Sequence, residues 1–447
     1  MSFMKKIIAS VGLVAAGAAS VQAQYAPGLT SQEMTKPWSL SASLRGFYDD
    51  NYLTLPANYA NGTGGYSHPL SSYGTEVTPS ASINHTTEDT VITASYIYDL
   101  KYFGNQDYTE QSHQLNLRFE HQFSERLKMS VGETCVIAQE PTMIDSSELV
   151  STPLVANGNN VHNTGKVDLT WELTKQLDVH VGGSTDLYAY RQVGGDENPP
   201  YSYASRSASL DRIDSLGMVD LRWKALEDTT GVFGYQYGHT GYTSPEYIIY
   251  PGTEPSAPNG FLANSRNSDQ DFVYLGADHS FTPDLNGSIR AGGEYIDYNK
   301  LPSPPGHTSK VSPYVDISVT DQYLPKSTVQ VGVKHVHSAT DVVGALGTGS
   351  PVLDSDTTAA YFSLNHSVSD KLTVSVLGQA QFSTFNGGGV GYNGKGEDFF
   401  IAGLNAAYQF NPFLLAEAGY NYSKLNSDLP DRGYTRNYLY IGVRATY

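Results

Sequence analysis

The sequence contains little of what disulfide-rich, metal-binding and helical membrane proteins require. Cys135 is the only cysteine among 447 residues, so an internal disulfide is excluded, and no Cys-x-x-Cys pair or His/Cys cluster suits a zinc ion. Beyond the first residues, no stretch of 18 uncharged apolar residues occurs, so no segment predicts a transmembrane helix. We therefore expect no cofactor, no structural metal and no thiol redox chemistry.

Basic residues are scarce relative to acidic ones, with 27 lysines and arginines against 45 aspartates and glutamates. This balance excludes nucleic acid as a partner. Two lysines precede an apolar run over residues 7–19, and a small-residue cleavage pattern ends at Ala23, as in secretory signal peptides. We predict a signal peptide over residues 1–23 and an exported domain over residues 24–447.

Aromatic residues and glycine, in contrast, are abundant: the chain has 33 tyrosines, 16 phenylalanines and 43 glycines. A helical membrane protein would be far more apolar. A transmembrane β-barrel is apolar on alternate residues only and places aromatic side chains at both membrane interfaces, which accounts for this mixed composition.

The last twelve residues, 436–447, alternate with the period of a β-strand. Leu439 and Val443 fall on one face and Arg444 on the other. About eighteen such runs follow one another, beginning with residues 39–48. We predict an all-β fold, a transmembrane antiparallel up-and-down β-barrel of about 18 strands, with about 16 as the alternative count.

Short and long connections alternate between these runs. The long ones are polar and rich in glycine and proline. The short ones share one form, an apolar residue followed by Ser, Thr or Asn, two further residues and Leu, at residues 123–127, 173–177, 281–285, 368–372 and 410–414. Short turns on one side and long loops on the other are typical of outer-membrane barrels.

Aromatic residues predict a membrane interface at the short-turn side. The last outward residue before a short turn or the chain end is aromatic at Phe123, Trp223, Phe281, Tyr323, Phe410 and Tyr447. Trp171 lies one outward step earlier and Trp38 begins the first strand. A soluble β-sandwich or propeller, the alternative, has no reason to place these residues at one end. By the same parity argument, we interpret His335 and His337 as interfacial side chains rather than metal ligands.

A family resemblance rests on residues 277–285 (ADHSFTPDL), on Gly287, Arg290 and Gly292 after them, and on the terminal strand. These motifs resemble the second-type β-barrel porin family of the outer membrane. The resemblance covers about a third of the chain. It implies a barrel fold and identifies no catalytic or binding residue.

Charged residues on the polar faces of the predicted strands would line the channel. They are Arg45, Arg118, Asp168, Glu172, Asp220, Arg222, Arg290, Glu294, Glu417 and Arg444. An arginine that faces hydrocarbon at the bilayer midplane costs about 2 to 4 kcal/mol, so these charges must point inward. Both signs occur, and the side chains could equally pair with one another and stiffen the wall.

The third long connection, residues 140–163, is a candidate constriction. In general porins, which the predicted architecture resembles, the third such loop folds into the lumen. Glu140, Asp145 and Glu148 would then face wall arginines across the opening, and buried apolar loop residues would contribute about 1.5 to 3 kcal/mol each. Alternatively, the apolar residues cap the barrel mouth or meet a neighbouring subunit.

No pattern of catalytic residues accompanies these charges. The sequence contains neither Gly-x-Ser-x-Gly nor His-Glu-x-x-His, so we expect no enzyme activity. We interpret the chain as an outer-membrane porin through which small hydrophilic solutes diffuse passively. The alternative is a plugged structural or adhesion barrel with surface-exposed binding loops.

Several partners follow from this interpretation. Outer-membrane lipids and lipopolysaccharide would surround a barrel exported through the periplasm, and the C-terminal strand would engage the barrel-assembly machinery. A homo-oligomer stays open. The acidic long loops predict a weak cation preference.

Overall fold

The computed structural model describes residues 36–447 except 58, 61–65, 106, 139–157, 192–203, 251–259, 303–305 and 345–349. The predicted signal peptide, residues 1–23, lies outside the described residues. Among the described residues, no helix is long and apolar enough to cross a membrane.

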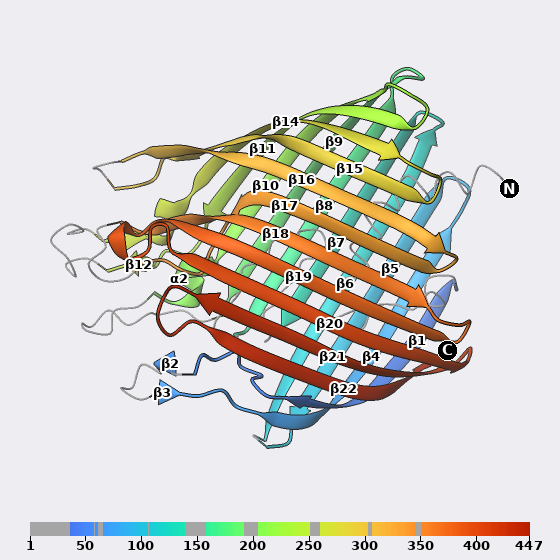
Figure 1. Cartoon of the computed structure of the whole chain (residues 1–447), viewed down its shortest axis with the longest axis horizontal. Coiled ribbons are helices and arrows are strands. Elements are labelled where there is room, and N and C mark those ends of the chain that lie inside the picture. The colour runs from blue at the N-terminus through green and yellow to red at the C-terminus, as the bar shows by residue number, and fades with distance from the viewer. Residues whose placement is uncertain are drawn as a thin grey trace.

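Eighteen long strands form one sheet (Figure 1). They are β1 (Trp38–Asp49), β4 (Ser72–Thr86), β5 (Thr90–Phe103), β6 (Tyr108–Ser124), β7 (Leu127–Ala138), β8 (Asn160–Glu172), β9 (Leu177–Tyr190), β10 (Arg212–Lys224), β11 (Thr229–Tyr242), β14 (Ser268–Ser280), β15 (Leu285–Tyr298), β16 (Thr308–Leu324), β17 (Ser327–Ser338), β18 (Val352–Ser367), β19 (Leu372–Gly387), β20 (Gly396–Asn411), β21 (Leu414–Ser427) and β22 (Tyr434–Thr446).

Pairing of the first and last strands closes the sheet. Each strand pairs antiparallel with its neighbours in the chain, and β22 pairs with β1 from Ser41↔Thr446 to Asp49↔Tyr438. Closure leaves no strand edge with unpaired backbone groups, which a membrane requires. The predicted up-and-down barrel of 18 strands is confirmed, and the count of 16 is wrong.

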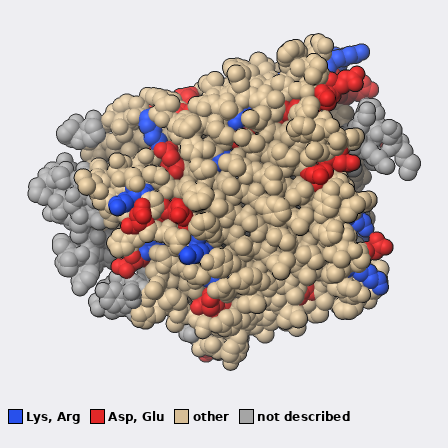
Figure 2. Space-filling view, in the orientation of Figure 1, with Lys and Arg blue, Asp and Glu red and all other residues tan. Residues whose placement is uncertain are grey.

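The strands alternate between an apolar outer face and a polar inner face. In β1, Leu40, Leu44 and Tyr48 are exposed on the outside, while Ser43 and Arg45 are buried on the other face. Figure 2 shows neutral residues over most of the middle of one outer face, with charged side chains gathering toward its two ends. This two-residue period is the pattern from which the strands were predicted.

The short-turn end carries an aromatic girdle. Trp38, Trp171 and Trp223 are each more than half exposed, at 52%, 52% and 58%. The Trp38 ring lies 5.6 Å from that of Tyr447, the carboxy-terminal residue, so the two ends of the barrel chain meet within this girdle. Exposed aromatic rings at one level are characteristic of a membrane interface.

Side-chain hydrogen bonds explain the repeated short-turn sequence. The hydroxyl of Thr174 accepts from the backbone N–H of Leu177 at 3.0 Å. Thr282 accepts in the same way from Leu285 at 3.0 Å, and Ser369 accepts from Leu372 at 3.1 Å. The Ser/Thr position therefore closes the hairpin by satisfying a backbone donor that the turn leaves unpaired.

Short elements gather at the opposite, long-loop end (Figure 1). They are β2 (Tyr59–Ala60), β3 (Tyr66–Ser67), α2 (Arg206–Leu210), β12 (Tyr247–Ile249), β13 (Phe261–Leu262) and the 3₁₀ turns η1 (Ala263–Arg266) and η2 (Gly389–Gly391). Ala208 of α2, Ile248 and Ile249 of β12, Phe261 and Ala263 form one buried apolar cluster with Tyr242. The long loops thus have a packed core of their own.

Candidate channel lumen and its charged residues

All ten residues predicted to line the channel lie in described strands, on the face opposite the exposed apolar residues. Arg222 follows the outward Leu221, Arg290 follows Ile289 and Arg444 follows Val443, all of which are exposed. That these residues meet solutes stays a prediction. Their accessibility separates them into a buried group and a group that water reaches.

Three of the buried residues, Arg45, Glu417 and Arg444, lie where the first and last strands meet. Arg45 donates from Nε to Glu417 at 2.7 Å and from Nη1 to Glu76 at 3.3 Å. Arg444 Nη2 lies 3.7 Å from the other oxygen of Glu417, and the Arg45 guanidinium lies 4.6 Å from the centre of the Tyr440 ring. The network joins β21, β22, β1 and β4, so these charges reinforce the closure of the barrel.

The accessible group includes two triads in which two cations share one carboxylate. Arg222 of β10 and Arg290 of β15 reach Asp278 of β14 at 2.7 and 2.9 Å. Arg118 and Lys128 both pair with Glu120, Lys128 at 3.4 Å. The side chain of Arg118 is 49% exposed although it points inward.

Each triad carries a formal charge of +1, because one carboxylate faces two cations. The pattern of charged residues in the sequence pointed to only one or two members of each triad. Asp278, Glu120 and Lys128 were missed although their inward parity in the strands would have found them.

Among the remaining predicted residues, Asp168 and Asp220 have titratable partners. His180 Nε2 lies 3.1 Å from Asp168, and the hydroxyl of Tyr274 donates to Asp220 at 2.6 Å. Glu172 is the last residue of β8, beside a short turn, and has no ion pair among the described residues.

Glu294 corrects the interpretation of His337 as an interfacial residue. Pairing of β16 with β17 ends at Val315↔His335, and Pro313, further along β16, has no N–H to continue it. The backbone N–H of His337 instead donates to the Glu294 carboxylate at 3.4 Å, and its Nδ1 lies 2.8 Å from that carboxylate. Glu294 is fully buried, so His337 contacts the wall interior rather than the membrane interface.

At the long-loop end, Arg432 fastens two loops and a strand together. It donates to Asp341 at 2.7 Å and to Glu397 of β20 at 2.5 Å. Burial opposes the charge of Arg432, but Asp341 and Glu397 outweigh it and raise the pKa of the guanidinium. The loop before β22 is thereby tied to the loop after β17.

Arg266 ties further loops together through backbone carbonyls. It donates to Thr340 at 2.6 Å, to Ser209 at 2.9 Å and to Leu353 at 3.4 Å, with its guanidinium 4.6 Å from the Tyr242 ring centre. Burial, which disfavours the charged form, lowers the pKa of this residue. Arg266 therefore joins loops that leave distant strands, β9 and β17.

The candidate constriction proposed from sequence cannot be placed, because Glu140, Asp145 and Glu148 lie outside the described residues. The sequence around Arg266 and Arg432 contains no pattern that predicts their role in joining the loops. Their role depends on which loops meet at the mouth, and a lone arginine in a polar loop carries no signal of that.

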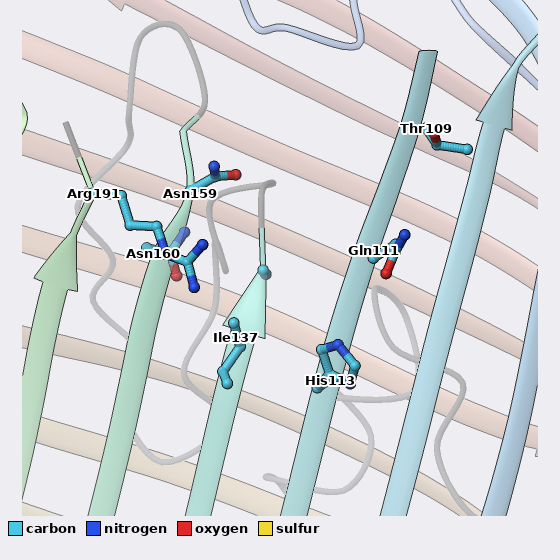
Figure 3. A pocket seen from close by; sticks show the side chains of 8 residues that line it. Thr109, Gln111, His113, Ile137, Asn159, Asn160 and Arg191 are labelled. Carbon is cyan, nitrogen blue, oxygen red and sulfur yellow. The ribbon is translucent and has the colours of Figure 1, made fainter. Parts of the chain in front are cut away.

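A cavity of about 250 Å³ lies at the long-loop end of β6 to β8 (Figure 3). It is lined by Thr109, Gln111, His113, Ile137, Ala138, Asn159, Asn160 and Arg191. The β6 residues among them share the parity of the exposed Leu115 and Leu117. The cavity therefore opens on the outer face and is not part of the lumen.

Comparison with protein families decides which barrels the chain is related to. Residues 261–447 match the model of the family described as Putative beta-barrel porin 2. Over these residues, the chain is similar to that family of β-barrel porins. The resemblance predicted from residues 277–285 and the terminal strand is thereby confirmed, and both segments lie inside the match. No curated protein matches the chain.

Solved outer-membrane proteins are similar over nearly the whole chain at low identity. OccK1 (OpdK) of Pseudomonas aeruginosa is 10% identical, with 92% of this chain and 99% of that chain covered, at a TM-score of 0.44. A BenF-like porin of Pseudomonas fluorescens is 12% identical, with 93% and 100% covered, at 0.42. The FrpB iron transporter of Neisseria meningitidis is 9% identical, with 94% and 83% covered, at 0.43.

Proposed function

We propose that this protein is an outer-membrane porin that lets small hydrophilic solutes diffuse passively. The observation that carries the proposal is the accessible charge on the inner wall. Arg118, Arg222 and Asp278 point away from the membrane face and yet have side chains 49%, 32% and 29% exposed. Closed barrels of about 16 to 18 strands leave an aqueous channel, and these residues line it.

The proposal includes export and membrane insertion. Residues 1–23 would direct the chain across the inner membrane and be removed, and the C-terminal strand would engage the assembly machinery. Lipids and lipopolysaccharide would contact the apolar outer face. We propose no catalytic activity, because the sequence contains no pattern of catalytic residues and the arginines of the inner wall pair with carboxylates.

Conductance of the purified protein in a planar bilayer tests this function. An open porin gives steady current steps. A barrel that is plugged at the mouth, the second candidate, gives none, and the loops held by Arg266 and Arg432 are the observation that favours it.

We further propose that residues 140–163 narrow the channel, with Glu140, Asp145 and Glu148 facing the wall arginines. Deleting residues 143–156 should raise the single-channel conductance markedly if the loop lies in the lumen. A folded variant with unchanged conductance would place the loop outside, at the mouth or against a neighbour.

A further inference from the structure

The carboxylate of Glu133 faces away from the lumen, as those of Asp269 and Asp271 on β14 do, but Asp269 and Asp271 accept hydrogen bonds from Tyr237 and Tyr235. Glu133 lies on β7 with the same parity as Val131 and Ile137, which are 38% and 37% exposed on the outer face. Its neighbour in the register on β6 is Leu117, which is 44% exposed. Glu133 therefore lies on the outer face of the barrel, which contacts the membrane, with apolar residues beside it on β6 and β7.

The position of Glu133 along β7 places it near the middle of the membrane. Leu127, which begins β7, pairs with Trp171 of the aromatic girdle. Six residues at about 3.3 Å each, on a strand tilted by about 40°, put Glu133 roughly 15 Å above that girdle. The apolar band of such barrels is about 25 Å tall.

The carboxylate lies flat against the wall. Asn163 of β8 donates from Nδ2 to Glu133 Oε1 at 2.7 Å. The second oxygen, Oε2, lies over Gly165, only 2.9 Å from where a Cβ of that residue would be. Gly165 thus provides the notch that holds the carboxylate, and Oε2 has no hydrogen-bond partner among the described residues.

At the level of Glu133, the adjoining outer face of β8 to β10 carries small and hydroxyl-bearing residues, with larger apolar residues such as Val181 and Val219 further along the strands. Thr185 pairs with Gly165 on one side and with Ser215 on the other, so these side chains form one row with Glu133. Neither hydroxyl has a hydrogen-bond partner within the described part of the chain. A Cβ at Gly217, also on this face, would meet no atom within 4 Å.

The carboxylate and hydroxyls of this row need hydrogen-bond partners, which the core of the bilayer cannot supply. At this depth lipids offer acyl chains only, and an ionisable group facing them is costly. A second copy of the chain supplies both hydrogen-bond donors and an acceptor, because its Thr185 and Ser215 hydroxyls donate and its Glu133 accepts. Small residues let two walls approach closely, as they do at membrane helix interfaces.

We propose that the outer face of β7 to β10 around Glu133 is the surface through which two copies of this protein associate in the membrane. The proposal rests on the membrane location given under the proposed function and does not require an open channel.

The single cysteine of the chain provides the probe. Cys135 lies on the same outward face, two residues from Glu133 and opposite Asn163. In native outer membranes, a short bismaleimide should join Cys135 of two copies into a covalent dimer. The matched control is C135S combined with L404C, since Leu404 is 50% exposed on β20, far from β7 around the barrel. This control should give no dimer at the same protein density.

Two substitutions at Glu133 test the polar contact itself. E133L removes the acceptor and should lower the crosslinked fraction about fivefold, the scale of an intramembrane polar contact, while the barrel stays folded. E133Q retains a hydrogen-bonding oxygen and should crosslink like the wild type. Equal crosslinking of Cys135 and the Leu404 control, or no effect of E133L, would overturn the proposal. Single-channel conductance, measured on the same samples, reports the porin function separately.

Discussion

Val443 and Arg444 are adjacent in the chain and face opposite sides of the barrel wall. Val443 is 46% exposed on the outer face, whereas Arg444 is 8% exposed and lies beside Glu417. Val443 thus faces hydrocarbon, whereas Arg444 faces the polar interior of the barrel. Each residue of a membrane strand is constrained by the side on which it falls.

Replacing Val443 or Leu439 with arginine should impair membrane assembly, because a cation on the lipid face costs about 2 to 4 kcal/mol at the midplane. Arg444→Ala should leave assembly intact. The fraction of heat-modifiable barrel in outer membranes measures both effects. Equal tolerance at the two parities would contradict the strand register.

Arg432 is a residue on which several loops depend. Arg432→Ala should lower the free energy of unfolding by about 3 to 5 kcal/mol, because Glu397 and Asp341 would be left without their cation. Arg432→Lys keeps the charge but not the two-pronged geometry, so its loss should be smaller. Denaturant unfolding in detergent measures these changes. Arg126→Ala, in an exposed short turn, is the control and should change nothing.

Among the elements, β22 has a special position because it pairs with both β21 and β1. Removing it leaves two strand edges whose backbone groups have no partners in lipid. Each unsatisfied group costs several kcal/mol there. No other strand can fill the gap, since every strand of the barrel already has two neighbours.

Deleting residues 438–447 should therefore abolish membrane insertion. Resistance of the folded barrel to heat in gel electrophoresis is the readout. A truncated chain that still migrated as a heat-resistant membrane species would show that closure does not depend on β22.

At the scale of the whole molecule, charge selectivity depends on the acidic groups that have no cationic partner. Residues 139–165 and 338–356 contain Glu140, Asp145, Glu148, Asp341, Asp354 and Asp356 and no Lys or Arg. Arg432 pairs with Asp341, and Lys310 pairs with both Asp354 and Asp356, so three of these carboxylates have a cationic partner. The inner-wall triads add positive charge.

A weak cation preference is the expected result, carried by Glu140, Asp145 and Glu148 within a Debye length of about 8 Å of the mouth. The reversal potential across a salt gradient measures it. Deleting residues 143–156, which removes two of the three carboxylates, should shift the preference toward anions. A reversal potential that favours chloride in the wild type would show that the lumen arginines dominate.

The sequence by itself determined that the chain forms a barrel of about 18 strands, the side on which most strand side chains fall and the alternation of short turns with long loops. These features are local, because a two-residue period and a Ser or Thr that closes a turn act over a few residues. Only the tertiary structure decided that Arg45 joins β1 to β4 and β21, that Asp278 serves two arginines, and that Arg266 and Arg432 fasten loops far apart in the chain. Those contacts depend on how the strands stagger as the sheet closes and on which loops then meet. The two-residue period of a single strand determines neither of these features.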